Sequence, residues 1–180
     1  MSKPSVRPAQ SSELPALVAL INSAYRGDAS RAGWTTEADL VDGQRTDADS
    51  LRADFERPDS VLLVAELAGR CVGCVFLERG HGGHTAQDEA YLGLLTIEPA
   101  AQSAGLGGAL LTQAEAWAVR SWGVSAMCMH VIAQRSEILA WYERRGYLPT
   151  GQTEAFPYGD PHAGLPKRAD LYFKILRKLL

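Results

Sequence analysis

The spacing of hydrophobic residues along the chain changes from segment to segment and predicts its elements. Over residues 11–25 apolar side chains recur at every third or fourth position, which predicts an amphipathic helix. Its apolar face consists of Leu14, Leu17, Val18 and Ile21. We expect Ser11 or Ser12 to cap this helix, with Pro15 in its first turn and a short strand over residues 4–8 before it.

Two β-rich segments follow, over residues 61–66 and 70–78, separated by the short turn Leu67-Ala-Gly69. Such runs on either side of a glycine-containing turn are typical of a β-hairpin. Residues 27–59, which precede the hairpin, are polar and acidic and carry only a few apolar anchors. We expect this stretch to form a loop with one or two short helices.

The second half of the chain begins with an apolar run at residues 92–97, passes through a glycine-rich turn and enters a helical pattern over residues 109–120. A strand is predicted at residues 124–131, and a further helical segment precedes a return to β structure. The closing residues 171–176 suit a terminal strand. The alternative is a basic amphipathic helix at a membrane surface, because the three basic residues at this end of the chain would share one helical face.

Three glycines, Gly105, Gly107 and Gly108, mark the turn between the predicted strand and helix. Glycines at a helix start leave the main-chain N–H groups of the first turn open to an anion, which the helix dipole also attracts. The alternative is that they serve only close packing between helix and sheet. A P-loop is excluded because the chain has no Gly-Lys pair, and a dinucleotide fingerprint is excluded because Leu110 stands where its third glycine belongs.

The segment Gln102-Ser-Ala-Gly105-Leu-Gly107, preceded by Thr96-Ile-Glu-Pro99, resembles the Q/R-x-x-G-x-G/A motif of the GNAT acetyltransferase superfamily. A second segment, Ile138-Leu-Ala-Trp-Tyr142-Glu-Arg-Arg-Gly146-Tyr147, is similar to the A-x-x-x-Y-x-x-x-G-F/Y signature of the same superfamily. The resemblance extends over residues 4–178. It implies an α/β (α+β) three-layer fold, with a mixed twisted sheet of about six to seven strands flanked by about four helices. We expect residues 1–180 to form one such domain.

In the superfamily the glycine loop holds the pyrophosphate of coenzyme A, so the resemblance implies acetyl-CoA as co-substrate and no metal. It also implies that the strand carrying Leu95 splays from its neighbour, and that the Leu95 amide polarises the thioester carbonyl. The residues expected to bind the cofactor are Leu95, Thr96, Ile97, Gln102, Ser103, Ala104, Gly105, Leu106, Gly107, Gly108 and Ala109. Arg135 stands where the superfamily often has asparagine, so its expected role is a phosphate contact or a loop cap.

The resemblance also implies a catalytic role for Tyr142, which by helix spacing alone would be a core aromatic residue. The matching tyrosine of the superfamily lies by the coenzyme sulfur, where a phenol with a pKa near 10 can protonate a thiolate with a pKa of about 8.5. An ammonium acceptor must lose a proton before it attacks. Tyr91 occupies the position of a catalytic carboxylate in some members, so we expect Glu89, two residues earlier, to act as base through a water. The alternative for Glu89 is a solvated carboxylate at a strand start.

The acceptor is expected to be an amine of a small molecule or a peptide, held among Tyr25, Trp34, Tyr91 and Phe156, which could equally be core residues. Residues 28–59 contain nine acidic and four basic side chains, which favours a cationic acceptor, although a solvated charged face would give the same count.

Composition narrows the class of protein. The chain has 180 residues, 46% of them hydrophobic, with 18 basic and 21 acidic side chains and a formal net charge of −3, so no surface for nucleic acid is indicated. We find neither an export signal nor an apolar run long enough to span a membrane. Three cysteines fit a reducing cytosol, and we expect a cytoplasmic protein. A homodimer is left open.

Two cysteine and histidine pairs, Cys71-x-x-Cys74 and His81-x-x-His84, contain enough ligands for a zinc ion. We expect no zinc there, because strand positions three apart point to opposite faces and the gap between the pairs is short. A redox role fails too, because the thioredoxin-like motif needs a helix N-terminus.

The sequence therefore predicts an enzyme that transfers acetyl from acetyl-CoA directly to an amine. The alternative from another class is a non-catalytic acyl-CoA-binding sensor or interaction module. The small residues Gly93 and Ala126 would also permit transfer of a longer acyl group.

Overall fold

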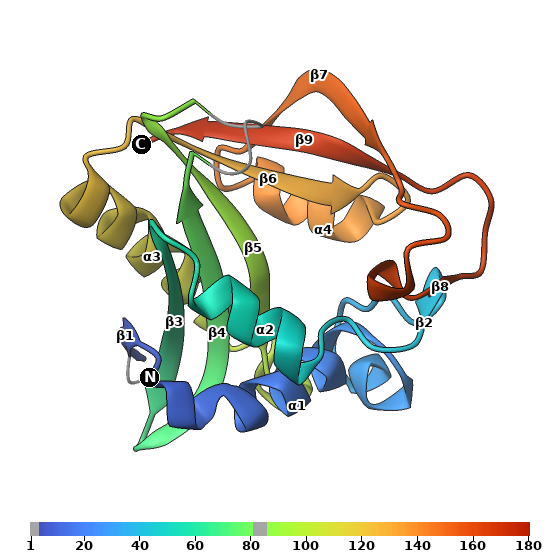
Figure 1. Ribbon diagram of the computed structural model, residues 1–180, viewed down its shortest axis with the longest axis horizontal. Helices are drawn as coiled ribbons and strands as arrows, with labels where there is room; N and C mark the ends of the chain where they lie inside the picture. The colour runs from blue at the N-terminus through green and yellow to red at the C-terminus, as the bar shows by residue number, and fades with distance from the viewer. Residues whose placement is uncertain (1–3, 81–85) are drawn as a thin grey trace.

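A seven-stranded mixed sheet lies at the centre of the computed structural model, which describes residues 4–80 and 86–180 (Figure 1). The strand order is β1-β3-β4-β5-β6-β9-β7, and β5 and β6 are its one parallel pair in the described part of the chain. The strands of this sheet are β1 (Ser5–Pro8), β3 (Ser60–Leu67), β4 (Arg70–Arg79), β5 (Glu89–Ile97), β6 (Ala126–Ile132), β7 (Leu148–Ala155) and β9 (Tyr172–Leu179). A separate antiparallel pair joins β2 (Val41–Asp42) to β8 (Leu165–Pro166).

Helices cover both faces of the sheet, as the resemblance implies (Figure 1). The α-helices are α1 (Leu14–Tyr25), α2 (Ala48–Phe55), α3 (Leu106–Trp122) and α4 (Ser136–Glu143), and the short 3₁₀ turns include η1 (Ser11–Glu13), η2 (Asp28–Ala32), η4 (Pro99–Ala101) and η5 (Pro161–Ala163). The first two α-helices pack on one face of β3, β4 and β5, and the last two pack on the other. The three-layer prediction is confirmed.

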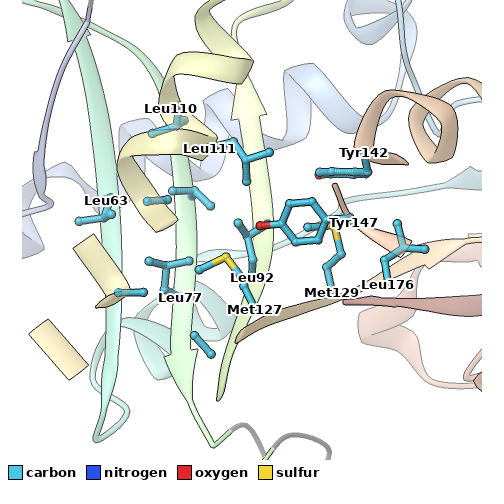
Figure 2. Packing of buried hydrophobic residues seen from close by; sticks show 14 of the residues in the cluster. Leu63, Leu77, Leu92, Leu110, Leu111, Met127, Met129, Tyr142, Tyr147 and Leu176 are labelled. Carbon is cyan, nitrogen blue, oxygen red and sulfur yellow. The ribbon is translucent and has the colours of Figure 1, made fainter. Parts of the chain in front are cut away.

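The larger core lies between the sheet and the pair α3 and α4, where leucines and methionines of the strands meet both helices (Figure 2). Tyr147 has no exposed surface, and its hydroxyl donates a 2.8 Å hydrogen bond to Glu115 on α3. The ring of Tyr142 packs edge-on against Tyr147, with ring centroids 5.8 Å apart. This core fixes the position of α4 and of the tyrosine predicted to be catalytic.

The local predictions for the hairpin and the last strand are confirmed. β3 and β4 pair antiparallel through a tight turn in which Ala68 and Gly69 both have positive φ angles, of 52° and 76°. Such turns follow the right-handed twist of the strands. The closing segment forms β9 between β6 and β7. The membrane-surface helix is therefore excluded for this segment, and no helix in the described ranges has both the length and the apolarity to cross a bilayer.

The predicted serine cap of the first helix is wrong. Gln10 is the N-cap of η1, which leads directly into α1, and the Glu13 side chain accepts a 2.7 Å hydrogen bond from the Gln10 amide. Arg7 holds the Glu13 carboxylate through two further hydrogen bonds of 2.9 and 2.8 Å. Because a carboxylate accepts more strongly than a hydroxyl, this arrangement replaces a serine cap.

Our reason for placing Cys71 and Cys74 on opposite faces is also wrong. The register of β3 and β4 shifts, so that Ala65 pairs with Gly73 while Glu66 pairs with Cys71, and Val72 is an extra residue. This bulge reverses the alternation, and both cysteines contact the core beneath α1. His81 and His84 lie outside the described residues. Within the described ranges no three histidine, cysteine or acidic side chains are grouped to hold a metal.

Candidate functional site

A cavity of about 490 Å³ opens where β5 and β6 separate. The two strands pair only over residues 89–91 and 126–128, although β5 continues to Ile97 and β6 to Ile132, and their ribbons diverge in Figure 1. The cavity is lined by β5, β6 and α4, by the glycine loop before α3, and by segments that follow α1 and β7. The splayed strand implied by the resemblance is therefore present.

The main chain of β5 is irregular where it lines the cavity. Its pairing with β4 shifts between Gly93 and Thr96, and Leu94 has a positive φ of 51°. Leu94 and Leu95 therefore lack partners in the ladder with β4, and β6 no longer pairs with this part of β5. The Leu95 carbonyl accepts a 3.1 Å hydrogen bond from the Tyr25 hydroxyl on α1. Polar main-chain groups are thus available to a ligand in the cavity.

The glycine loop places the N-terminus of α3 at the same cavity. Gly105 caps the helix in the left-handed conformation, with φ of 79°, and a Cβ there would meet nothing within 4 Å. No side chain caps the helix, so the amides of its first turn have no such partner. A Cβ at Gly107 would lie 3.5 Å from Trp141, and one at Gly108 would lie 3.3 Å from Arg145. Gly105 thus leaves space open, whereas the next two glycines allow α4 to approach.

The other predicted cofactor residues divide into three groups. The Gln102 side chain bridges two main chains, accepting a 3.0 Å hydrogen bond from the Trp34 amide and donating a 3.1 Å one to the Ile97 carbonyl. It therefore positions the loop. The other predicted residues that line the cavity are Leu95, Thr96, Ile97, Ser103, Gly105, Gly107 and Gly108. Those outside the lining are Ala104, which is exposed, Leu106, which is core, and Ala109.

Tyr142 lines the cavity from α4 and is 7% exposed. Its ring packs edge-on against Trp141, with centroids 5.0 Å apart, and no residue in the described ranges forms a hydrogen bond with its hydroxyl. Burial raises the pKa of Tyr142 above its ordinary value. The phenol therefore stays protonated and can donate a proton in the cavity.

Glu89 does not lie at the cavity. Its carboxylate accepts hydrogen bonds of 2.9 and 2.7 Å from Arg177 on β9, and the Cys128 thiol lies 3.3 Å from its other oxygen. Glu89 does share a strand face with Tyr91, but it sits at the start of β5, before the strands separate. The structure thus separates this expected base from Tyr142 and pairs it with a cation.

His130 is a titratable cavity residue that our sequence reasoning missed. It lies on β6, and its Nδ1 is 3.3 Å from a Glu154 carboxylate oxygen on β7. Its ring packs edge-on against Tyr91, with centroids 5.4 Å apart. At this distance the Glu154 carboxylate can accept a hydrogen bond from a protonated Nδ1. The available signal was one histidine in the otherwise uncharged run Ala126-Met-Cys-Met-His130-Val-Ile.

The four predicted acceptor residues all line the cavity but lie in different surroundings. Trp34 is beside the glycine loop, with its ring 6.4 Å from Trp141. Phe156 is 5% exposed and stacks on Phe173, so it is chiefly a core residue. Tyr25 ends α1 and its hydroxyl reaches the Leu95 carbonyl, and Tyr91 packs against His130. Burial raises the pKa of Tyr91, and that of Tyr25 to about 12.

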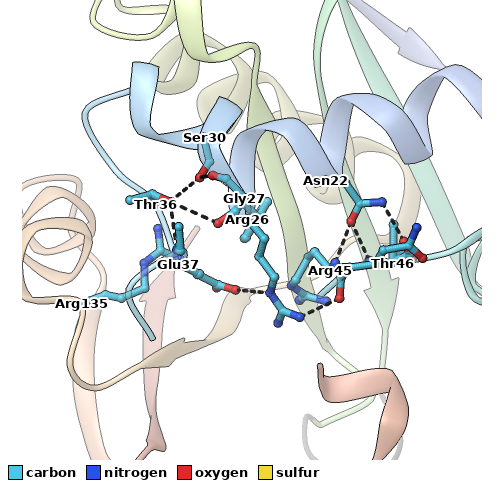
Figure 3. Close-up of polar contacts among 12 residues, drawn as sticks. Asn22, Arg26, Gly27, Ser30, Thr36, Glu37, Arg45, Thr46 and Arg135 are labelled. Atoms are coloured by element: carbon cyan, nitrogen blue, oxygen red, sulfur yellow. Dashed lines mark hydrogen bonds and ion pairs between the residues drawn. The ribbon is translucent and has the colours of Figure 1, made fainter. Parts of the chain in front are cut away.

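A buried ion-pair network joins the two halves of the cavity wall. Glu37 is 5% exposed, and its carboxylate accepts hydrogen bonds from Arg26 at 3.2 Å and from Arg135 at 3.0 Å (Figure 3). Arg135 also donates a 2.7 Å hydrogen bond to Thr35. Arg135 therefore holds the segment after η2, which is closer to the loop-capping alternative than to a phosphate contact. The acidic residues of positions 28–59 do not gather at this cavity, because Glu37 alone among them lines it and it faces two arginines.

Comparison with known proteins agrees with this geometry. A family model described as "Acetyltransferase (GNAT) family" matches residues 20–147. Among solved structures, a ribosomal-protein-alanine N-acetyltransferase from Brucella melitensis is 20% identical, with a TM-score of 0.71 over 98% of this chain and 99% of that one. A PaiA N-acetyltransferase from Thermoplasma acidophilum, solved with coenzyme A, is 17% identical, with a TM-score of 0.70 over 100% of both chains.

A third solved structure is a chimeric spermidine N-acetyltransferase from Vibrio cholerae and hSSAT, 16% identical, with a TM-score of 0.68 over 99% of this chain and 96% of that one. No curated protein matches the chain in sequence. At these identities the solved structures establish the fold, and the family model covers most of the chain, including the glycine loop and Tyr142. The chain therefore belongs to the acetyltransferase (GNAT) family and is an N-acetyltransferase that uses acetyl-CoA.

Proposed function

We propose that this enzyme transfers acetyl directly from acetyl-CoA to a primary amine of a small molecule or peptide bound in the cavity beside Tyr142. The observation that carries the proposal is the separation of β5 from β6 at the N-terminus of α3. One cavity thereby contains main-chain groups that lie outside the strand ladder, an uncapped helix start and a protonated phenol. These are the groups that a thioester with a pyrophosphate tail requires.

The residues of the glycine loop fit coenzyme A by their chemistry. The first-turn amides of α3 would bind the pyrophosphate, and the open space at Gly105 would let it approach the main chain. Arg145 lies next to Gly108 with its guanidinium 3.6 Å from the Trp141 ring centroid, and it would add a positive charge at the same end. The Leu95 main chain would hold the acetyl carbonyl.

The reaction then needs two proton transfers. We assign the first to His130, which takes a proton from the ammonium of the acceptor, directly or through a water. The neutral nitrogen attacks the thioester carbonyl, an N–C bond forms, and the C–S bond breaks as the electron pair leaves on sulfur. Tyr142 donates its proton to this thiolate. Glu154 orients His130 and stabilises its cationic form.

The cavity does not contain the features that would favour a longer acyl chain. A Cβ added at Gly93 would lie 3.0 Å from the ring of Tyr91, so this ring fills the space beside the glycine. Ala126 is fully buried and does not line the cavity. We therefore propose acetyl as the group transferred.

A thiol-release assay with acetyl-CoA tests the proposal. The acceptors would be amino acids, polyamines, arylalkylamines, aminoglycosides and lysine peptides, with calorimetric titration of coenzyme A alongside. Turnover with one class of amine is the expected result. Tight coenzyme A binding without turnover on any amine would support the sensor alternative, and no binding would contradict the assignment of the cavity.

A further inference from the structure

Two arginines differ from the others in the described part of the chain. Seven arginines there are buried or half-buried, and five of them form ion pairs with carboxylates: Arg7, Arg26, Arg79, Arg135 and Arg177. The two without an ion pair are Arg45 and Arg145, and both line the cavity. Arg145 lies at the glycine loop, where the cofactor supplies phosphates. Arg45 lies at the end formed by α1 and the loop before α2.

The position of Arg45 is fixed by its main chain. Its amide donates a 2.6 Å hydrogen bond to the Asn22 side chain, which also bonds both main-chain groups of Thr46 (Figure 3). Arg26 donates a 2.6 Å hydrogen bond to the carbonyl of Gln44, on the other side of Arg45. The loop is thus held to α1 on both sides of this residue. The guanidinium lies over the Tyr25 ring, 5.4 Å from its centroid.

The carboxylates near Arg45 form hydrogen bonds or ion pairs with other residues. Glu37 faces Arg26 and Arg135, and Asp160 accepts a 2.9 Å hydrogen bond from the His162 amide. Arg45 also lines a second cavity of about 400 Å³, where Asp47 caps α2 by accepting a 2.8 Å hydrogen bond from Ser50 and Asp54 forms an ion pair with Arg57. Against the effect of burial, the charges of Glu37 and Asp54 raise the pKa of Arg45, but neither carboxylate forms an ion pair with it. No hydrogen bond from the Arg45 guanidinium to another described residue exists. Arg45 is half-buried and lines the cavity, so its guanidinium N–H groups are open to a ligand there.

The acidic residues at positions 28–59 favoured a cationic acceptor, but the side chains that line the cavity carry a net positive charge. Four arginines and two carboxylates of the described chain line it. The Tyr25 ring, which could have held a cationic acceptor, instead contacts two guanidinium groups, those of Arg45 at 5.4 Å and Arg135 at 5.9 Å from its centroid. A polyamine would meet like charge at this end, whereas an anionic group would meet the arginine.

We propose that the acceptor carries a carboxylate on the same small molecule as its amine, as an α-amino acid does, and that the Arg45 guanidinium binds this carboxylate. This inference rests on the proposed function and names its substrate class. Tyr25 connects the two ends of the acceptor site, because its ring lies beneath Arg45 and its hydroxyl reaches Leu95 on β5. A carboxylate at Arg45 would therefore direct the amine of the same molecule towards β5. The planar guanidinium can bind a carboxylate through two parallel hydrogen bonds.

The test compares each α-amino acid with its amide and its decarboxylated amine in the thiol-release assay. We expect kcat/KM to be higher for the free acid, and Arg45→Met to reduce this preference by about 10- to 100-fold. Arg144→Met is the matched control, since Arg144 is exposed and forms no ion pair with a described residue. It should leave the preference unchanged. Coenzyme A affinity should be the same in both variants.

A second readout does not depend on turnover. Protein saturated with coenzyme A is heated with each compound, and a rise in melting temperature reports binding. Binding of amino acids that is lost in Arg45→Met, but without turnover, would support the carboxylate site while contradicting the proposed acetyl transfer. Equal use of acid, amide and decarboxylated amine, an unchanged preference in Arg45→Met, or no binding by any carboxylate would overturn the inference.

Discussion

At the scale of single residues, the proposed chemistry depends on two side chains, Tyr142 on α4 and His130 on β6. Tyr142 is held by the edge-on packing of Trp141 and Tyr147, and His130 is oriented by Glu154. The same core that packs α4 against the sheet therefore sets the position of the proton donor. The proposed base comes from a strand whose other residues are all buried.

Replacing Tyr142 with phenylalanine keeps this packing and removes the proton. We expect kcat to fall about 100-fold, because the thiolate must leave without a general acid. Coenzyme A affinity, measured by calorimetry, should stay near that of the wild type. An unchanged kcat would show that Tyr142 is a core residue only.

His130→Gln should lower kcat/KM by about 100-fold and remove the fall in rate at acidic pH that protonation of a base produces. Glu89→Gln is the informative comparison, because Glu89 faces Arg177 outside the cavity. The pH profile of both variants distinguishes the two candidates. A larger loss in Glu89→Gln than in His130→Gln would restore Glu89 as the base.

At the scale of elements, α3 has a left-handed glycine at each end, and these two glycines provide a matched pair. Gly105 and Gly123 have φ angles of 79° and 65°, and a Cβ at either would meet nothing within 4 Å. A side chain is strained equally at both, by about 1–2 kcal/mol. Only Gly105 lines the cavity.

Gly105→Glu and Gly123→Glu should therefore lose similar stability in urea denaturation, but only the first should lose coenzyme A binding. The introduced carboxylate would occupy the space meant for the pyrophosphate and repel it. Calorimetric titration measures the difference. Unchanged affinity in Gly105→Glu would mean that the glycines of this loop serve packing alone.

At the scale of the whole molecule, Glu37 joins segments that are far apart in the chain. Its two arginine partners end α1 and begin α4, and all three side chains are at most 10% exposed. Loss of the negative charge would remove the buried carboxylate that both guanidinium groups share. This network, rather than any surface ion pair, holds the first helix and its following segment against the second half of the sheet.

Glu37→Gln should therefore lower the free energy of unfolding by about 3–5 kcal/mol, measured by urea denaturation. Asp39→Asn, two residues away, removes an exposed ion pair with Arg31 and should cost at most about 1 kcal/mol. Similar losses in both variants would contradict the role that we assign to the buried network.

The sequence alone determined the features that depend on neighbouring residues. The 3.6-residue period of α1, the turn chemistry of the β3–β4 hairpin and the glycines before α3 are all local signals, so they predicted helix, hairpin and loop correctly. The family motifs likewise lie in continuous stretches around Gly105 and Tyr142.

Only the tertiary structure decided which polar side chains meet. Glu89 pairs with Arg177, 88 positions away, and Glu37 pairs with Arg135, 98 positions away. Neither pairing could be predicted from the residues next to the carboxylate. The bulge at Val72 reversed the alternation around the cysteines because register belongs to two strands and not to one. Arg45 forms no ion pair with a described residue. The sequence could not show this, because it depends on where the neighbouring carboxylates lie in the folded chain.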